Sequence, residues 1–180
     1  DPAFAYELAV IIQDGIRRMY EAGENCFYYI TVGNESYPMP AMPEGDSVKE
    51  GILKGMYLFR SGNMPNAPYK ATLLGSGAIL NEALKAQELL ASKYQVNADV
   101  WSVTSYKELR NEGMECERYG LLHPGETRIP YVTQCLKNNA GVVVAASDYV
   151  KLLPDSIARW VPGGLTSLGT DGFGRSECRT

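Results

Sequence analysis

Hydrophobic residues near the start of the chain recur at steps of three and four. This spacing places them on one face of a helix over residues 3–22, and Pro2 suits the first turn of such a helix. The next segment, residues 26–32, is rich in aromatic and β-branched residues, which predicts a strand. The apolar positions of the predicted helix are Phe4, Leu8, Ile11, Ile12, Ile16 and Met19.

Residues 33–43 interrupt this pattern with three prolines between positions 38 and 43. Because proline fixes φ and lacks an N–H donor, this segment is neither a regular helix nor a central strand. Residues 51–60 indicate a turn of helix running into a strand. Residues 61–68 consist largely of turn-forming residues, so we place the boundary of a self-contained unit near residue 68.

Beyond residue 68, short apolar runs alternate regularly with longer amphipathic segments. The runs are apolar throughout, which is typical of parallel strands covered on both faces. Right-handed crossovers then place the helices against the sheet. The pattern predicts a three-layer α/β/α fold with a mostly parallel sheet. Strands are expected at 69–74, 98–104, 142–147 and 165–168, and helices at 78–94, 106–119, 129–137 and 149–160, the last interrupted at Pro154.

The composition narrows the possible partners. The 180 residues are 45% hydrophobic and 21% charged, which is ordinary for a globular protein and excludes disorder and collagen. The net charge of −4 comes without a cluster of Lys and Arg, so we expect no nucleic acid partner. No apolar run approaches the roughly 18 residues of a membrane span, so we expect no membrane partner.

The cysteines and the histidine predict little chemistry of their own. The cysteines are too widely spaced for a C-x-x-C pair or a dense disulfide framework, so we predict reduced thiols. With no secretory leader visible, a cytoplasmic location is expected. The single histidine, His123, lies in a turn, where we predict a structural hydrogen bond and no metal site. The four cysteines are Cys26, Cys116, Cys135 and Cys178.

Two glycine-containing segments are candidate anion sites. Gly75-Ser76-Gly77 lies between a predicted strand and a predicted helix, where backbone N–H groups can hold an anion. Leu80 stands where the third glycine of a dinucleotide motif belongs, so a tight turn is the alternative. The second segment, 169–176, follows a strand at the carboxyl edge of the sheet, where open α/β sheets bind ligands. Within it Arg175 either clamps a carboxylate or phosphate or is simply solvated.

Glu35 is the candidate for proton transfer. It follows a predicted strand and precedes the proline-rich segment, so its carboxylate has a stiff support. The alternative is a solvated loop glutamate, which is the common state of such a residue.

Taken in order, several segments resemble one family. This is the homodimeric pyruvate dehydrogenase component of bacterial complexes, which decarboxylates its substrate with thiamine diphosphate. The resemblance runs over essentially the whole chain. The matching segments identify the family because they occur together in the same order, and no single segment would be specific enough. The matching segments are 29–31, 34–37, 39–45, 74–77, 99–105, 116–118, 122–124, 147–149 and 168–176.

The resemblance implies a C-terminal fragment of a longer enzyme. Residues 1–40 correspond to the tail of a middle, pyrimidine-binding domain with its last helix and strand, and 41–67 to a linker. Residues 68–180 correspond to a truncated transketolase-like C-terminal domain. The family holds the cofactor through a G-D-G…N motif, and this chain contains no Gly-Asp-Gly. The resemblance therefore implies that the fragment alone is inactive and binds neither thiamine diphosphate nor Mg²⁺.

For the intact enzyme the resemblance implies decarboxylation of pyruvate on thiamine diphosphate with Mg²⁺. Reductive acetylation of the lipoyl group of an acyltransferase partner would follow, carried out by a homodimer. Glu35 is the implied catalytic carboxylate, and Pro38 stands where some members have a histidine. The resemblance leaves unknown which residues of this chain contact the cofactor, and it assigns no metal ligand among them. The other residues implied to lie in the active-site loops are Asn34, Tyr37, Asp171, Phe173 and Arg175.

Two other functions remain open from the residues alone. One is a small nucleotide-binding α/β domain that uses residues 75–77. The other is a non-enzymatic dimerisation or assembly module, which is compatible with the fragment interpretation.

Overall fold

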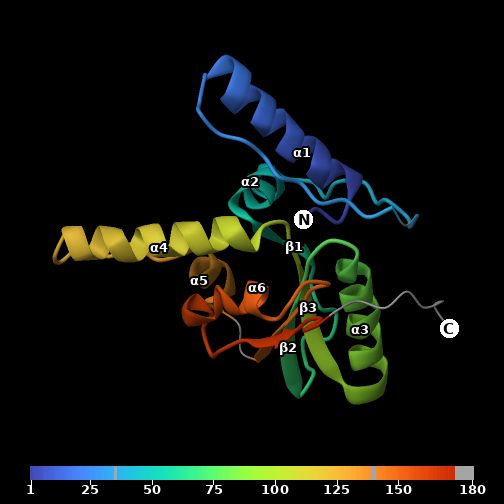
Figure 1. Ribbon diagram of the computed structural model, residues 1–180. Coiled ribbons are helices and arrows are strands. Elements are labelled where there is room, and N and C mark those ends of the chain that lie inside the picture. Colours follow the sequence, from blue (N-terminus) through green and yellow to red (C-terminus); the bar gives the residue numbers. More distant parts are fainter. Residues whose placement is uncertain (35, 139–140, 173–180) are drawn as a thin grey trace.

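The computed structural model describes residues 1–34, 36–138 and 141–172. Within them a five-stranded sheet has the order β1-β3-β2-β4-β5 (Figure 1). Strand β1 runs antiparallel to β3, and the other neighbouring pairs are parallel. The mostly parallel sheet predicted from the apolar runs is thus confirmed. The strands are β1 (Met56–Arg60), β2 (Tyr69–Gly75), β3 (Val96–Val103), β4 (Val142–Ala146) and β5 (Thr166–Leu168).

Helices cover both faces of the sheet and make the three predicted layers. Helix α3 (Ile79–Tyr94) lies on one face, and α4 (Tyr106–Leu122), α5 (Tyr131–Leu136) and α6 (Leu152–Asp155) lie on the other (Figure 1). Adjacent strand residues alternate between two cores, because successive side chains point to opposite faces. Leu73 packs in the core that contains α3 residues, whereas Leu74 packs in the core shared with α4 and α5.

The amino-terminal helix lies across the end of the sheet. It comprises α1 (Ala5–Ile16) and one π-helical turn, η1 (Arg17–Glu21), which confirms the helix predicted over residues 3–22. Figure 1 shows α1 beyond the end of the sheet at which α4 begins, with α2 (Asp46–Lys54) beside it. Phe4 is buried in the core on the α3 side, so the segment is packed onto the sheet.

Residues 26–32 do not form the strand that their composition predicts. A strand needs a neighbouring strand to complete its hydrogen bonds, and in the described chain this segment follows α1 instead of the sheet edge. Its exposure still alternates as in an extended chain: Phe27 and Tyr29 are each 86% exposed, whereas Tyr28 between them is partly buried. Residues 26–32 are therefore extended, as their composition favours, but no strand of the described sheet pairs with them.

The turn of helix running into a strand that is predicted over residues 51–60 is confirmed: α2 is followed by β1, which pairs with β3 at the sheet edge. Both elements lie within the stretch 41–67, which the family resemblance assigns to a linker. The helix predicted over 149–160 is divided into α6 and a 3-10 turn, η2 (Ala158–Trp160). Pro154 lies inside α6, because the first turn of a helix does not use the N–H that proline lacks.

Candidate functional site

The carboxyl ends of β2 and β3 are covered by the first residues of the chain. Strand β2 is where the strand order reverses, which is the usual ligand position of an open α/β sheet. There the N–H of Gly77 donates to the Asp1 carbonyl at 3.1 Å, and the Asp1 nitrogen donates to the Thr104 carbonyl at 2.7 Å. The chain itself therefore occupies the place where a nucleotide would bind.

Gly77 is the residue that makes this contact possible. Its φ is +51°, and a Cβ added to it would lie 2.7 Å from a carboxylate oxygen of Asp1. Gly75 is also tight, because a Cβ there would lie 2.8 Å from the Cα of Leu80. The structure thus favours the tight turn over the anion site for residues 75–77.

We expect Gly77→Ala to lower the free energy of unfolding by about 1–2 kcal/mol, the usual cost of a left-handed backbone for a residue with a Cβ. Urea unfolding of the chain measures the change. Gly33→Ala is the matched control, because nothing lies within 4 Å of a Cβ at position 33. Equal stability of the two variants would contradict the left-handed backbone of Gly77.

A fully buried carboxylate, Glu7, joins α1 to the sheet. Its side chain accepts hydrogen bonds from the backbone N–H groups of Ala3 at 2.5 Å and Phe4 at 3.1 Å. It also accepts from the hydroxyls of Tyr57 in β1 at 2.6 Å and Ser102 in β3 at 2.7 Å. Four donors satisfy the carboxylate, as a buried charged group requires. We call these five residues the Glu7 cluster.

The phenol groups of Tyr57 and its neighbour Tyr6 both have raised pKa values. Burial raises the pKa of Tyr6 to about 12, and its hydroxyl is hydrogen-bonded to that of Tyr57. Burial and the negative charge of Glu7 raise the pKa of Tyr57 far above its usual value. Both phenols are therefore neutral near pH 7, so Tyr57 is available as a donor to the carboxylate.

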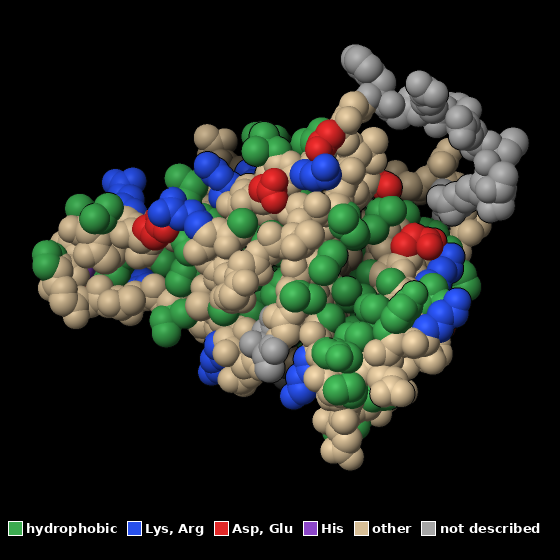
Figure 2. All heavy atoms as spheres, turned by 90° about the horizontal axis from the view of Figure 1, so that it is seen from below, with side chains coloured by type: hydrophobic (Ala, Val, Ile, Leu, Met, Phe, Trp, Pro, Cys, Tyr) green, Lys and Arg blue, Asp and Glu red, His purple; other side chains and the backbone are tan. Residues whose placement is uncertain are grey.

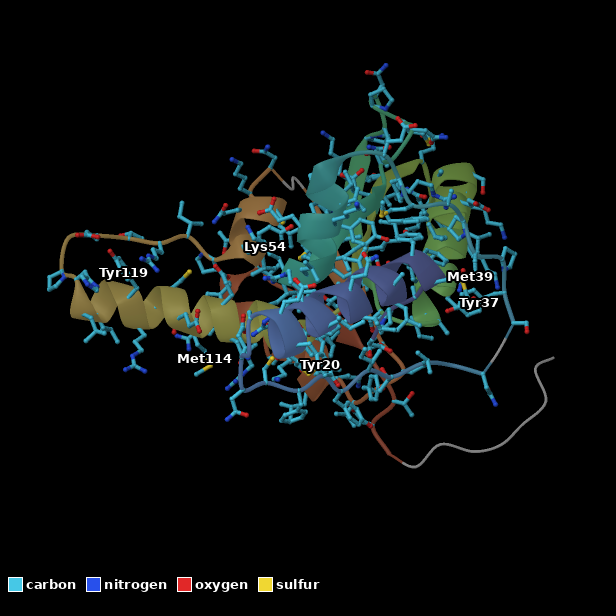
Figure 3. The ribbon with its side chains drawn as sticks, turned by 90° about the horizontal axis from the view of Figure 1, so that it is seen from above. Tyr20, Tyr37, Met39, Lys54, Met114 and Tyr119 are labelled. Atoms are coloured by element: carbon cyan, nitrogen blue, oxygen red, sulfur yellow. The ribbon has the colours of Figure 1, made fainter. Side chains whose placement is uncertain are left out.

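The loop 33–43, which contains the predicted active-site residues, is fastened to the start of α1 by Tyr37. The Tyr37 hydroxyl donates to the Ala3 carbonyl at 2.5 Å, and the Tyr37 ring meets the Phe4 ring edge-on at a centroid distance of 6.3 Å. Figure 3 shows Tyr37 and Met39 at the amino-terminal end of α1. Asn34 is exposed, and Glu35 lies outside the described residues.

Asp171, from the second predicted loop, is fastened to the start of α6. Its carboxylate accepts from the backbone N–H of Lys151 at 2.9 Å and forms an ion pair with the Lys151 ammonium at 3.1 Å. The backbone hydrogen bond, and then the side-chain one, lowers the pKa of Asp171 below its usual value. Phe173 and Arg175 lie outside the described residues. The two predicted loops are thus held at different places: Tyr37 is bonded at the start of α1, and Asp171 at the start of α6.

A cavity of about 460 Å³ lies where the amino-terminal segment meets the sheet. Its walls come from α1, residues 27–31, the end of α2 and the start of α4. Tyr28 closes one side, packed against Gly15, where a Cβ would lie 3.4 Å from the ring. The cavity therefore sits at the seam between the two parts of the chain.

A chain of hydrogen bonds holds Tyr28 over this cavity. The Tyr28 hydroxyl donates to Asp14 at 2.6 Å and accepts from Arg18 at 3.1 Å, and Arg17 forms an ion pair with Asp14 at 2.8 Å. Partial burial acts to raise the pKa of Asp14, but the hydrogen bonds from Tyr28 and Arg17 outweigh it and hold the pKa below 3.8. Asp14 thus stays ionised in mildly acidic solution.

We expect the stability difference between the native chain and Asp14→Asn to depend on pH. Because the pKa of Asp14 is lower in the folded state, its stabilising contribution is complete above the unfolded-state value of 3.8. It is lost as the pH falls through the folded-state pKa, since the unfolded chain takes up the proton first. Denaturant unfolding at a series of pH values measures the difference. A difference that grows below pH 4 would contradict this assignment.

The histidine and the described cysteines show no sign of a reactive site. As predicted, His123 is hydrogen-bonded in a turn: its Nδ1 lies 3.0 Å from the Tyr119 carbonyl, and its ring stacks on that of Tyr119. Burial, and then a hydrogen bond to Glu112, raises the pKa of Cys116 to about 11. Cys26 and Cys135 are free thiols, and Cys178 lies outside the described residues.

Some kinds of site are absent from the described part of the chain. No group of three or more His, Cys, Asp or Glu residues there could hold a metal ion. None of the described helices combines the length and the hydrophobicity of a transmembrane span. On the face shown in Figure 2, Lys and Arg side chains are spread over several places and alternate with acidic ones, without forming a basic stripe.

The Glu7 cluster was missed by the sequence analysis. A glutamate three residues after the N-cap is a signal for a local helix cap, and the Phe4 N–H does donate to the Glu7 carboxylate. Nothing local indicates the bonds to Tyr57 and Ser102, which lie 50 and 95 residues further along the chain.

Comparison with known families gives two matches in chain order. The pyruvate dehydrogenase E1 component middle domain matches residues 1–40, and the transketolase-like TK C-terminal domain matches residues 55–180. The solved transketolase from Leishmania mexicana aligns with a TM-score of 0.41 and 20% identity, over 73% of this chain and 16% of that one.

Among curated relatives, three proteins named pyruvate dehydrogenase E1 component are each 50% identical to the chain. They come from Pseudomonas aeruginosa, Mycolicibacterium smegmatis and Escherichia coli K12, and each alignment covers 99% of this chain. The chain spans 20%, 19% and 20% of their respective lengths.

Proposed function

The chain belongs to the transketolase-like C-terminal domain family, and we propose that it is the C-terminal region of a pyruvate dehydrogenase E1 component. The observation that carries this proposal is the 50% identity to proteins of that name over 99% of the chain. The middle-domain match over residues 1–40 supports it, because the two matches follow one another in the order middle, then C-terminal.

In this proposal the complete enzyme decarboxylates pyruvate with thiamine diphosphate and Mg²⁺. It then transfers the acetyl group, with reduction, to the lipoyl group of an acyltransferase partner. It works as a homodimer in the cytoplasm. The cofactor supplies the carbon chemistry, and the protein supplies binding, orientation and proton transfer.

The described residues do not fit the role of cofactor anchor. Mg²⁺ that is bound together with a diphosphate takes only one or two side-chain oxygens from the protein, and this chain lacks the Gly-Asp-Gly motif that supplies them in the family it resembles. The helix N-terminus after β2, where a diphosphate would otherwise bind, meets the Asp1 backbone. We therefore assign the anchor to other parts of the complete enzyme.

The contribution of this chain is a loop beside the reaction centre. Glu35 handles protons there, and Asn34 and Tyr37 shape the same pocket. Tyr37 supports this role because its hydroxyl bond to Ala3 fixes the loop on the packed end of α1. Asp171, Phe173 and Arg175 form a wall near the entrance, supported by the ion pair of Asp171 with Lys151.

The test uses the complete protein and the 180-residue chain side by side. With thiamine diphosphate and Mg²⁺, the complete protein should release CO₂ from pyruvate and acetylate a lipoyl domain. The chain alone should show neither reaction and no heat of cofactor binding by calorimetry. Micromolar binding of the cofactor to the chain alone, or no turnover of pyruvate by the complete protein, would overturn the proposal.

A role of this chain in dimerisation or assembly is compatible with the proposed function, and a separate observation supports it. The extended segment 26–32 exposes the large apolar side chains of Phe27, Tyr29 and Val32. Contiguous exposed apolar groups mark surfaces that bind other protein segments. The chain alone should therefore self-associate and bind a hydrophobic dye, which light scattering and dye fluorescence measure. A monomer that binds no dye would contradict this role.

A further inference from the structure

The Glu7 cluster does more than cap a helix. Capping of α1 needs only the hydrogen bond that the Phe4 N–H donates to the Glu7 carboxylate, and an exposed glutamate would accept it equally well. Here the carboxylate is fully buried and also accepts from Tyr57 in β1 and Ser102 in β3. A buried charge with four donors fixes the positions of all of them, because each bond has a narrow geometry.

The cluster is connected to the loop 33–43 through Ala3. The N–H of Ala3 donates to Glu7 at 2.5 Å, while its carbonyl accepts from the Tyr37 hydroxyl at 2.5 Å. The Phe4 ring, next to the second backbone donor, packs edge-on against Tyr37. A continuous path of hydrogen bonds thus runs from the sheet through Glu7 and Ala3 to Tyr37.

We propose that Glu7 is a positioning residue of the pyruvate dehydrogenase reaction, holding the loop 33–43 in place through Ala3 and Tyr37. This inference rests on the proposed function. Glu7 touches no reacting group in this scheme, and it acts by fixing the peptide that receives the Tyr37 hydroxyl. A displacement of about 1 Å in a group that supports the reaction centre can cost about a hundredfold in rate.

The decisive variant is Glu7→Gln in the complete enzyme. Glutamine keeps the volume of Glu7 but has one acceptor oxygen in place of two, and it lacks the negative charge that strengthens all four hydrogen bonds. The bond to the Ala3 N–H is therefore weaker in this variant, and the anchor of Tyr37 is less firmly held. We expect kcat for pyruvate to fall about tenfold with a smaller change in KM, because the variant loosens the loop without removing any side chain that shapes the pocket. Tyr37→Phe, which keeps the ring, should give a similar fall.

A double-variant cycle separates positioning from general destabilisation. When Tyr37→Phe has already removed the anchor, Glu7→Gln should lower kcat by less than a further twofold. Multiplication of the two separate effects would overturn the proposal, because it would show that Glu7 acts independently of Tyr37. Glu82→Gln is the matched control: this exposed glutamate of α3 pairs with Lys85, and its loss should leave kcat unchanged.

Amide hydrogen exchange of the complete enzyme tests the same path without turnover. Glu7→Gln and Tyr37→Phe should each speed exchange in the peptide that contains residues 33–43 at least fivefold, and Glu82→Gln should not. Unchanged exchange in Glu7→Gln overturns the positioning role whatever the activity. Faster exchange in an enzyme that does not turn over pyruvate would leave the path standing and refute the proposed function instead.

Discussion

Replacing Glu35 by glutamine in the complete enzyme is expected to lower kcat for pyruvate by about 10²–10⁴-fold, the usual contribution of a positioned acid–base group. Glutamine matches glutamate in shape but cannot take up or release a proton. Steady-state assays of reductive acetylation measure the change, with KM determined in parallel. The expected signature is a large loss in kcat with a smaller change in KM.

The control for this variant is Glu50→Gln. Glu50 lies in α2, where it forms an exposed ion pair with Lys54. Its replacement should leave kcat within about twofold of the native value, as expected for a surface pair. A Glu35→Gln enzyme that keeps more than a third of native kcat would exclude Glu35 from proton transfer, and the loop would then serve only to shape the pocket.

Leu74→Ala is expected to lower the free energy of unfolding by about 2–5 kcal/mol, the range for removing a buried leucine side chain. Leu74 lies on the central strand β2, is fully buried, and packs in the same core as Val103 and Leu109. Guanidinium unfolding of the chain gives the value. The large effect follows because this core joins strands to helices from distant parts of the sequence.

Leu89→Ala, on the outer side of α3, is the matched control for Leu74→Ala. The Leu89 side chain is half exposed, so its truncation should cost less than about 1 kcal/mol. Similar losses in the two variants would contradict the placement of Leu74 in the core. They would also question the alternation that sends Leu73 and Leu74 to opposite faces.

The alternating part of the fold could be predicted because its signals are local. Each strand there is an apolar run, and each long helix has its own periodicity, so β2 and α3 could be located from a few residues around each. Turn chemistry was equally local: the tight approach after β2 needs small residues, and Gly75 and Gly77 supply them. Such features need no knowledge of the rest of the chain.

The errors have a common physical origin in partners that are remote in sequence. Residues 26–32 have strand propensity, but a strand exists only when a neighbour completes its ladder. By contrast, the strand predicted within residues 51–60 does form as β1, because Met56 pairs with Val103 across the sheet edge. In both cases pairing over a long sequence distance decided the outcome.

The candidate site was predicted only in part for the same reason. The resemblance pointed to the loop that contains Tyr37, and the structure shows what holds that loop. It did not point to Glu7, whose partners Tyr57 and Ser102 are brought near only by folding. Sequence motifs mark the residues that line a site more readily than those that support them.

The way in which α1 is attached limits how the molecule can move. The bonds from Tyr57 and Ser102 to Glu7 cross from the sheet to the helix, and the Thr104 carbonyl is bonded to Asp1. A hinge rotation that opened this seam would have to break these bonds together. We therefore expect α1 and the sheet to travel as one rigid body, so that access to the neighbouring pocket is controlled by motion of short peptide segments and not by swinging of whole domains.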